Sequence, residues 1–278
     1  SRTAVACTAA YGGCVPERKT FMVLVVARNE KAHADITALN LEAGRAAQGV
    51  ATVLTVADIP GHNDVSPFAG DDPLFAEALV EYIGQPIFAV AADSLEEAIA
   101  AAKLADVGYC EKPHMLTIDA AAKAGSKIEA SQEMGQGDAS AALTAAPNRL
   151  KGSFRIGGQD HFYLEGQIAL ATPLEDGDVH VFSSTQHPSE VQHLVGHVLG
   201  IPSNAVTVEV RRMGGGFGGK ETHPAMFAAM AALAAVKTGR PAKLRLDRDD
   251  DMIMTGKRHD FKYDYDVGFD ADGRILGI

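Results

Sequence analysis

The sequence predicts an α+β fold, because short β-type runs alternate with helical segments along most of its 278 residues. In the first half, β-branched runs are separated by stretches rich in alanine. The second half repeats this alternation and adds two longer apolar segments of helical length. The elements expected in the first half are strands at Val23–Val26 and Thr52–Val56, a short helix around Ala43–Ala47, and further elements at Ala76–Ile83 and Pro86–Ala91.

A further helix is expected directly after Ser94. Ser94 and Glu97 form a capping box, in which a serine hydroxyl and a glutamate carboxylate satisfy free amides at a helix start. Leu95, Ile99 and Leu104 recur at helical spacing. We expect these three side chains to form one face of the helix.

The second half is expected to hold five strands and two helices. The helices are predicted at Pro188–Leu199 and Pro224–Val236. Phe269–Ile275 reads as a strand, a turn and the start of an unpartnered strand, which predicts a piece of a longer polypeptide. The expected strands are His161–Leu170, Val179–Ser184, Val206–Val210, Lys243–Leu246 and Phe261–Phe269.

Composition excludes several classes of partner. The apolar content of 46% is enough to bury a core, and the length suits one large or two ordinary domains. The net charge of -11 argues against binding to nucleic acid or to an anionic membrane. No apolar run has the roughly 20 residues of a membrane span, and the N-terminus lacks a signal-type core, which predicts a cytoplasmic protein. Cys7, Cys14 and Cys110 form no CxxC pair and are expected to be reduced thiols.

The segment from Gly214 to Glu221, with the sequence GGGFGGKE, is the strongest candidate binding site. A predicted strand precedes it and a predicted helix follows it. Glycines leave the backbone open to close approach, and a helix start presents free amide N–H groups. Together they favour a ligand that carries phosphate or oxo groups.

A nucleotide P-loop is the first alternative for this segment. Gly214, Gly219 and Lys220 satisfy the pattern G-x-x-x-x-G-K, but the next residue must be Ser or Thr to hold magnesium. Glu221 occupies that position, and a carboxylate there would repel phosphates. A purely structural turn is the second alternative. It is less favoured, because the segment has five glycines and ends in charged residues.

The other clusters of polar residues are expected to have structural roles. His193 and His197 lie four residues apart, but no Glu follows His193 as a zincin motif requires. Asp247, Asp249, Asp250 and Asp251 lack the Gly and the terminal Glu of a calcium loop, so we expect a cluster that is solvated or paired with Arg248 and Arg258. His161, Phe162 and Tyr163 are expected to pack within a strand.

Three segments in this order resemble the molybdenum-binding large subunit of the xanthine dehydrogenase and aldehyde oxidase family, with the bacterial xanthine dehydrogenases most similar. The resemblance extends from about Lys31 to Ile278 and does not include the first 30 residues. The three segments are Gly157–Glu165 (GGQDHFYLE), Ser183–Pro188 (SSTQHP) and Arg212–Thr222 (RMGGGFGGKET).

This resemblance implies a domain order. Residues 1–130 are expected to form an α/β-hammerhead domain, with the fold of residues 1–30 left open. Residues 131–150, which are rich in Ser, Ala, Gly and Gln, are expected to be a linker. Residues 151–278 are expected to be the first part of a molybdopterin cofactor-binding domain.

The resemblance also implies the roles of six residues. Gly215, Gly216, Phe217 and Gly218 are expected to contact the molybdopterin, which itself holds the molybdenum without a direct protein ligand. Gln186 is expected to point its amide at the oxo ligand of the metal, a task suited to a neutral donor that does not titrate. Taken alone, Gln186 would more often be a helix-entry residue. Glu221 is expected to hydrogen-bond a purine substrate and to stabilise charge that develops during reaction.

The activity implied is hydroxylation of a purine such as xanthine or hypoxanthine, as in xanthine dehydrogenase, with oxygen derived from water. Electrons would pass through iron–sulfur clusters and FAD to NAD. Because Cys-rich and dinucleotide motifs are absent here, these groups are expected on a partner subunit or on further segments. The general base of the family, a Glu, lies beyond the part that this chain matches. The alternatives are oxidation of an aldehyde or another heterocycle, or a cofactor-binding scaffold fragment, and the isolated chain is expected to be inactive.

Overall fold

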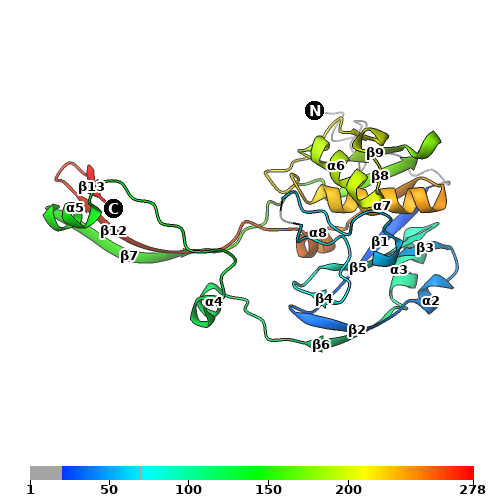
Figure 1. Cartoon of the computed structure of the whole chain (residues 1–278), viewed down its shortest axis with the longest axis horizontal. Helices are drawn as coiled ribbons and strands as arrows, with labels where there is room; N and C mark the ends of the chain where they lie inside the picture. Colours follow the sequence, from blue (N-terminus) through cyan, green and yellow to red (C-terminus); the bar gives the residue numbers. More distant parts are fainter. Residues whose placement is uncertain (1–20, 69) are drawn as a thin grey trace. The chain divides into compact units, whose positions relative to one another are not determined.

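The structure is a computed structural model that describes residues 21–68 and 70–278. The chain forms two compact units, each made from two separate stretches of sequence (Figure 1). Unit 1 contains the described residues up to Pro113 together with His161–Gly256, and unit 2 contains His114–Asp160 together with Lys257–Ile278.

A seven-stranded sheet forms the centre of unit 1. Its strand order, β10-β9-β8-β11-β1-β5-β3, places strands from both halves of the sequence side by side. The halves meet where β1 pairs in parallel with β11, with Val23 opposite Lys243. The strands are β1 (Met22–Arg28), β3 (Val50–Leu54), β5 (Pro86–Ala92), β8 (Ile168–Pro173), β9 (Val179–Ser183), β10 (Val206–Glu209) and β11 (Ala242–Arg245).

Helices cover both faces of this sheet. On one face lie α6 (Pro188–Leu199) and α7 (Pro224–Thr238), as Figure 1 shows. Their buried side chains form one core cluster with those of the strands, such as Leu24. Every residue of β5 is buried, and its alternate side chains enter two different clusters, one on each face. Near-continuous burial of the first twelve residues of α7 explains its alanine-rich sequence, since small side chains allow close packing.

The capping box after Ser94 is present, and it begins helix α3 (Leu95–Ala102). Ser94 Oγ accepts a hydrogen bond of 3.3 Å from the Glu97 amide. The predicted face of Leu95, Ile99 and Leu104 is not the one that packs against the sheet, however. Ala98 and Ala101 are the buried side chains of this helix, whereas Leu95, Ile99 and Leu104 are 37–51% exposed. Only small side chains fit between this helix and the sheet.

A second sheet of unit 1 has three short strands in the order β4-β2-β6. Its central strand, β2 (Ala34–Asn40), pairs antiparallel with both neighbours. The segment Ala76–Ile83 contains only the two-residue strand β4 (Leu79–Val80). The remaining elements of unit 1 are β6 (Asp106–Glu111), α2 (Glu42–Arg45), α8 (Arg248–Met254) and the 3-10 turns Val56–Asp58, Glu175–Gly177 and Ser203–Ala205.

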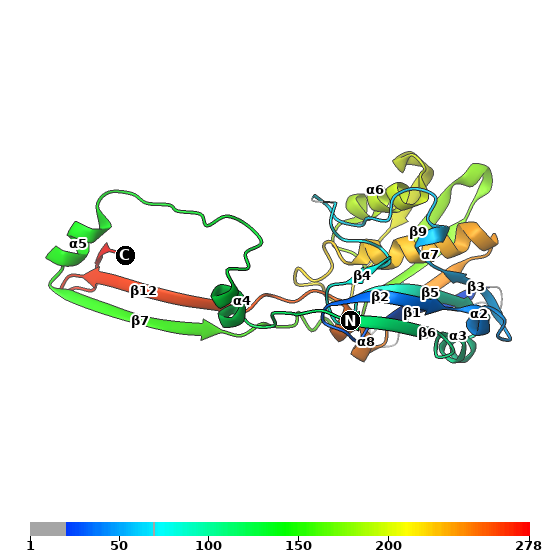
Figure 2. The same ribbon diagram turned by 60° about the horizontal axis from the view of Figure 1, so that its bottom comes forward.

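Unit 2 is built on a long antiparallel pair, β7 (Asn148–Ile156) and β12 (Phe261–Phe269), which runs along the unit in Figure 2. β13 (Ile275–Gly277) pairs with β12, so the strand expected to be unpartnered has a partner. Helix α5 (Ala139–Ala145) and the start of β7 lie within residues 131–150, which therefore hold regular structure where a plain linker was expected. A further short helix, α4 (Ile118–Ala124), was not predicted.

No helix of the described residues is long and apolar enough to cross a membrane. Cys110 is an exposed free thiol, and Cys7 and Cys14 lie outside the described residues.

Candidate functional site

The glycine segment forms a loop between β10 and α7, as the sequence predicts, with Phe217, Gly218 and Glu221 exposed. Its glycines are required for two different reasons. Gly215 and Gly218 have φ of 100° and 91°, which side chains rarely adopt. Gly216 lacks space, because a Cβ there would lie 2.5 Å from Gln186 Oε1. Phe217 also has a positive φ of 55° and is 75% exposed, a strained and open placement typical of ligand-contacting loops.

Gln186 is bound directly to this loop, at the turn that leads from β9 into α6. Its Oε1 accepts hydrogen bonds from the backbone amides of Gly218, at 2.9 Å, and Lys220, at 3.2 Å. The backbone N–H of Gln186 donates to the Lys220 carbonyl oxygen at 2.7 Å. Two N–H donors at one end identify that end of the carboxamide as the oxygen. The Nε2 end therefore remains to donate, and it makes no hydrogen bond within the described part of the chain.

Lys220 lies beneath the loop and is completely buried. Its Nζ donates to Ser184 Oγ at 2.7 Å and to the Glu165 carbonyl at 2.6 Å, and it lies 3.4 Å from Glu165 Oε2. It also lies 4.7 Å from the centre of the Tyr163 ring. Burial lowers the pKa of the Lys220 amine, and the Glu165 carboxylate opposes this shift.

The segment before β8 supplies the floor of the site. The expected strand begins only at Ile168, yet Tyr163, Glu165 and Gln167 still point alternately toward the loop. The Tyr163 hydroxyl donates to Asp251 Oδ1 at 2.6 Å, and the backbone N–H of Gln167 donates to Asp251 Oδ2 at 2.6 Å. Burial and the Asp251 carboxylate raise the pKa of the Tyr163 hydroxyl. The sequence pattern did not predict this buried network.

Glu221 follows the loop directly and is exposed. The amine of the preceding residue, Lys220, binds Glu165. Within the described residues, the Glu221 carboxylate forms neither a hydrogen bond nor an ion pair. Its carboxylate is therefore not engaged within the part of the chain that the structure describes.

The aspartate cluster is structural, but its arginine partners were predicted wrongly. Asp250 forms an ion pair of 2.8 Å with Arg28, and Asp247 caps the start of α8. Arg248 instead donates to the backbone carbonyls of Tyr163 and Leu164. Arg258 donates to the carbonyl of Gly157.

The histidine pair of α6 also has a packing role. The ring of His197 stacks on His62 with centroids 4.2 Å apart. Burial and the neighbouring imidazoles of His62 and His193 lower the pKa of His197. Among the described residues, no group of three or more His, Cys, Asp or Glu side chains could hold a metal ion.

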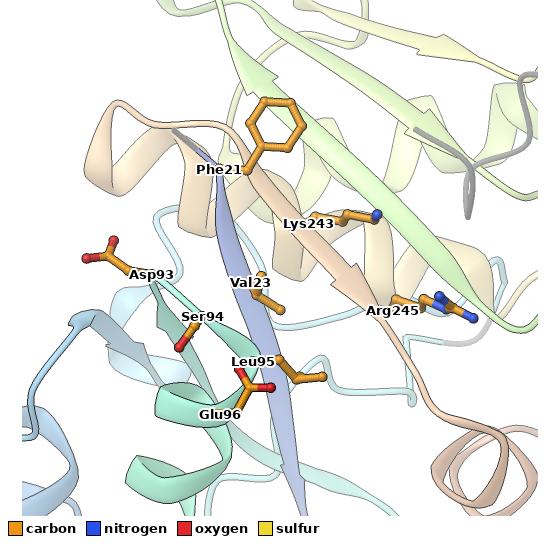
Figure 3. Close-up of a pocket in the computed structure, with 8 residues that line it drawn as sticks. All are labelled: Phe21, Val23, Asp93, Ser94, Leu95, Glu96, Lys243 and Arg245. Carbon is orange, nitrogen blue, oxygen red and sulfur yellow. The ribbon is translucent and has the colours of Figure 1, made fainter. Parts of the chain in front are cut away.

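A separate pocket of about 330 Å³ lies on unit 1 between β1, β11 and the start of α3 (Figure 3). Lys243 and Arg245 line it from β11, and Asp93 and Glu96 line it from the start of α3. None of the residues predicted for the site lines this pocket. The candidate site is thus the open glycine loop and not this pocket.

The donors at the glycine loop fit a ligand that accepts hydrogen bonds. Within the described residues, no hydrogen bond is made by the backbone amides of Gly215, Gly216 and Phe217 or by Gln186 Nε2, although Gly216 itself is buried. Oxo groups, phosphates and ring carbonyls are acceptors of this kind. A molybdopterin carries all three, so the loop fits this group by its chemistry.

The fold and the loop define an α/β hammerhead followed by part of a molybdopterin-binding domain. Residues 121–278 match the family model of the molybdopterin cofactor-binding domain. Residues 8–113 match the model of the aldehyde oxidase and xanthine dehydrogenase a/b hammerhead domain. The chain therefore belongs to the molybdenum hydroxylase family of xanthine dehydrogenases and aldehyde oxidases. The match begins at residue 8, which corrects the expectation that the similarity starts near Lys31.

Relatives and solved structures agree with this assignment. The chain is 38% identical over 271 residues to a xanthine dehydrogenase/oxidase of Gallus gallus and 41% identical over 252 residues to a xanthine dehydrogenase of Oryza sativa. These matches cover 97% and 89% of the chain, which spans 20% and 18% of the two relatives. An aldehyde oxidoreductase of Desulfovibrio gigas has the same fold over 98% of this chain and 32% of its own, with a TM-score of 0.85 at 24% identity.

Proposed function

We propose that this chain is part of an enzyme that hydroxylates a purine, with xanthine or hypoxanthine as substrate. The xanthine dehydrogenases among its relatives support this substrate class. The observation that carries the proposal is the fixed carboxamide of Gln186, whose oxygen is held by Gly218 and Lys220. Its Nε2 is thereby presented beside the glycine loop as a donor of fixed direction.

Each residue of the loop has a defined task in this proposal. The amides of Gly215, Gly216 and Phe217 bind acceptor groups of the cofactor, and Gly218 keeps the backbone close to it. Molybdopterin, when bound, supplies the two-electron oxidation of a substrate carbon. Gln186 donates from Nε2 to an oxo group and cannot lose a proton at working pH.

Glu221 acts on the substrate in this proposal. Its exposed carboxylate accepts a hydrogen bond from a purine ring N–H and stabilises positive character there. An aldehyde offers no such N–H, so Glu221 favours a purine over an aldehyde. The general base and the groups that clamp the substrate ring are proposed to come from outside this chain.

The remaining partners follow from the same proposal. Iron–sulfur clusters and FAD, on a partner subunit or on further segments, would carry electrons to NAD. The remainder of the molybdenum-binding chain would complete the site, and the assembled enzyme would work in the cytoplasm. The described residues hold one part of the site only.

The test uses the complete protein that contains this chain. We expect about one molybdenum and one pterin per chain, and faster turnover of xanthine than of an aromatic aldehyde. Faster turnover of the aldehyde would reassign the substrate class. Absence of molybdenum from a folded, complete protein would favour a scaffold without activity and contradict the proposal.

A further inference from the structure

A fully buried ammonium group lies directly under the glycine loop. The Lys220 side chain has no exposed surface, and its Nζ contacts Ser184 Oγ, the Glu165 carbonyl and Glu165 Oε2. A buried charge is tolerated only where it is paired and hydrogen-bonded. Such a group is retained for a reason other than simple filling of space, since a methionine would fill the same volume.

The backbone of the same residue holds Gln186 in place. The Lys220 backbone N–H donates to Gln186 Oε1 at 3.2 Å, and the Lys220 carbonyl oxygen accepts from the backbone N–H of Gln186 at 2.7 Å. The same carbonyl accepts from Thr185 Oγ1 at 3.2 Å. The position of the buried amine therefore sets the position of the groups that orient Gln186.

Glu165 fixes the other end of the loop. Its Oε2 accepts hydrogen bonds from the Gly214 amide at 2.9 Å and from Ser184 Oγ at 2.6 Å. Its own amide donates to the Gly214 carbonyl at 3.2 Å. Glu165 thus links the two ends of the loop, because its carboxylate contacts the Gly214 amide at the start and the Lys220 amine at the end.

We propose that Lys220 and Glu165 are positioning residues, which hold the Gln186 carboxamide with its Nε2 toward the ligand side of the loop. Neither side chain touches the ligand itself, because Lys220 lies beneath the loop and Glu165 is bound to its underside. The role of Gln186 toward an oxo group rests on the proposed function, but its orientation by Lys220 does not.

The first experiment measures this orientation without the cofactor. Hydrogen–deuterium exchange of the Gly218 amide and of the amide at position 220 is compared in the complete cofactor-free protein and its Lys220→Met variant. We expect exchange at both amides to become roughly tenfold faster in the variant, since their acceptor is no longer fixed. Lys237→Met is the matched control, because Lys237 pairs with Asp58 far along α7 from the loop. The control should leave both amides unchanged.

Ser184→Ala is a milder second variant, which removes the hydroxyl between Lys220 and Glu165 and adds no new group. It keeps the proposal testable where Lys220→Met does not fold. We expect faster exchange at the same two amides, by a smaller factor. Unchanged exchange at both amides in every one of these two variants that folds would overturn the proposal.

The second experiment is a double-mutant cycle on the cofactor-loaded enzyme. The rate per bound molybdenum is measured for Lys220→Met, Gln186→Ala and the double variant. If Lys220 acts through Gln186, its substitution lowers the rate roughly tenfold or more in wild type and has little further effect once Gln186 is removed. Independent losses that multiply would contradict this coupling. Failure to bind molybdenum would count against the proposed function alone, because the exchange experiment needs no metal.

Discussion

Gly216 and Gln186 are in direct contact, although 30 positions separate them in the sequence. A Cβ at position 216 would lie 2.5 Å from Gln186 Oε1 and 2.7 Å from Cδ, well inside any normal contact. Gln186 cannot move away freely, because Gly218 and Lys220 hold its oxygen. The glycine at 216 is therefore needed by the protein itself, before any ligand is considered.

This contact predicts the effect of Gly216→Val. The branched side chain would displace the Gln186 carboxamide and distort the loop, while the sheet and α7 remain in place. We expect the complete protein to fold but to lose its molybdopterin, measured as molybdenum per chain beside the thermal midpoint of unfolding. Gly135→Ala is a suitable control, since a Cβ at 135 has nothing within 4 Å. A normal molybdenum content in folded Gly216→Val protein would contradict a cofactor-binding loop.

The buried network predicts a loss of stability for Tyr163→Phe. The Tyr163 hydroxyl donates to Asp251 and accepts from Gln167 Nε2 at 2.9 Å, and both partners are buried. Removing the hydroxyl leaves a buried amide and a carboxylate oxygen with fewer partners, so we expect a cost of about 1–3 kcal/mol in the free energy of unfolding. Tyr263→Phe, at a site 39% exposed, should change this free energy by less than about 0.5 kcal/mol. Equal effects of the two substitutions in urea unfolding would contradict the network.

Elements with local signals were predicted well from the sequence. Helix α6 begins at Pro188 and ends at Leu199 as predicted, because a proline starts it and Gly200, with a left-handed backbone, ends it. β12 was also predicted with the correct bounds, since its residues alternate clearly. Such signals involve only residues that are close together in the sequence, so they can be recognised without knowledge of the fold.

Features that depend on distant contacts were not predicted. The strand β7 is mostly exposed and mixes basic with apolar residues, so its pattern alone did not reveal it. The Tyr163–Asp251 bond joins residues 88 positions apart. The segment Gly214–Glu221 was predicted as a binding site from its own residues, whereas the individual roles of Gln186, Gly215–Gly218 and Glu221 came from a family resemblance. Lys220 and Glu165 were found only when the structure placed their side chains together.

The raised pKa of Asp72 predicts how the stability of unit 1 depends on pH. Burial, with further contributions from Asp64 and Asp71, raises the pKa of the Asp72 carboxyl from 3.8 to about 6. The folded state therefore binds this proton more tightly than the unfolded state, so stability falls as pH rises from about 4 to about 6. Above pH 6, the full cost of the buried carboxylate is present. Asp72→Asn should raise the urea midpoint at pH 7 and flatten its dependence on pH in this window.

The exposed Asp106 provides the control for this titration. Asp106→Asn should leave the shape of the pH profile between 4 and 6 unchanged. Urea midpoints at pH 4, 5, 6 and 7 for both variants and wild type give the comparison. A midpoint at pH 7 that falls in Asp72→Asn would mean that the carboxylate stabilises the fold, which contradicts a pKa raised by burial.

Glu221 gives the most direct test of the substrate-contact role. The amine of the neighbouring Lys220 is bound by Glu165. Within the described residues, the Glu221 carboxylate forms no ion pair. If the carboxylate stabilises charge on a purine, Glu221→Ala should lower xanthine turnover per molybdenum by roughly 10²- to 10³-fold, the range for one preorganised group. Molybdenum content and the unfolding midpoint should stay unchanged, since no structural bond is lost. Glu175→Ala, at an exposed turn of the same unit, should change none of these quantities. If Glu221 has a structural role instead, the variant loses metal or stability while each bound molybdenum turns over at the wild-type rate.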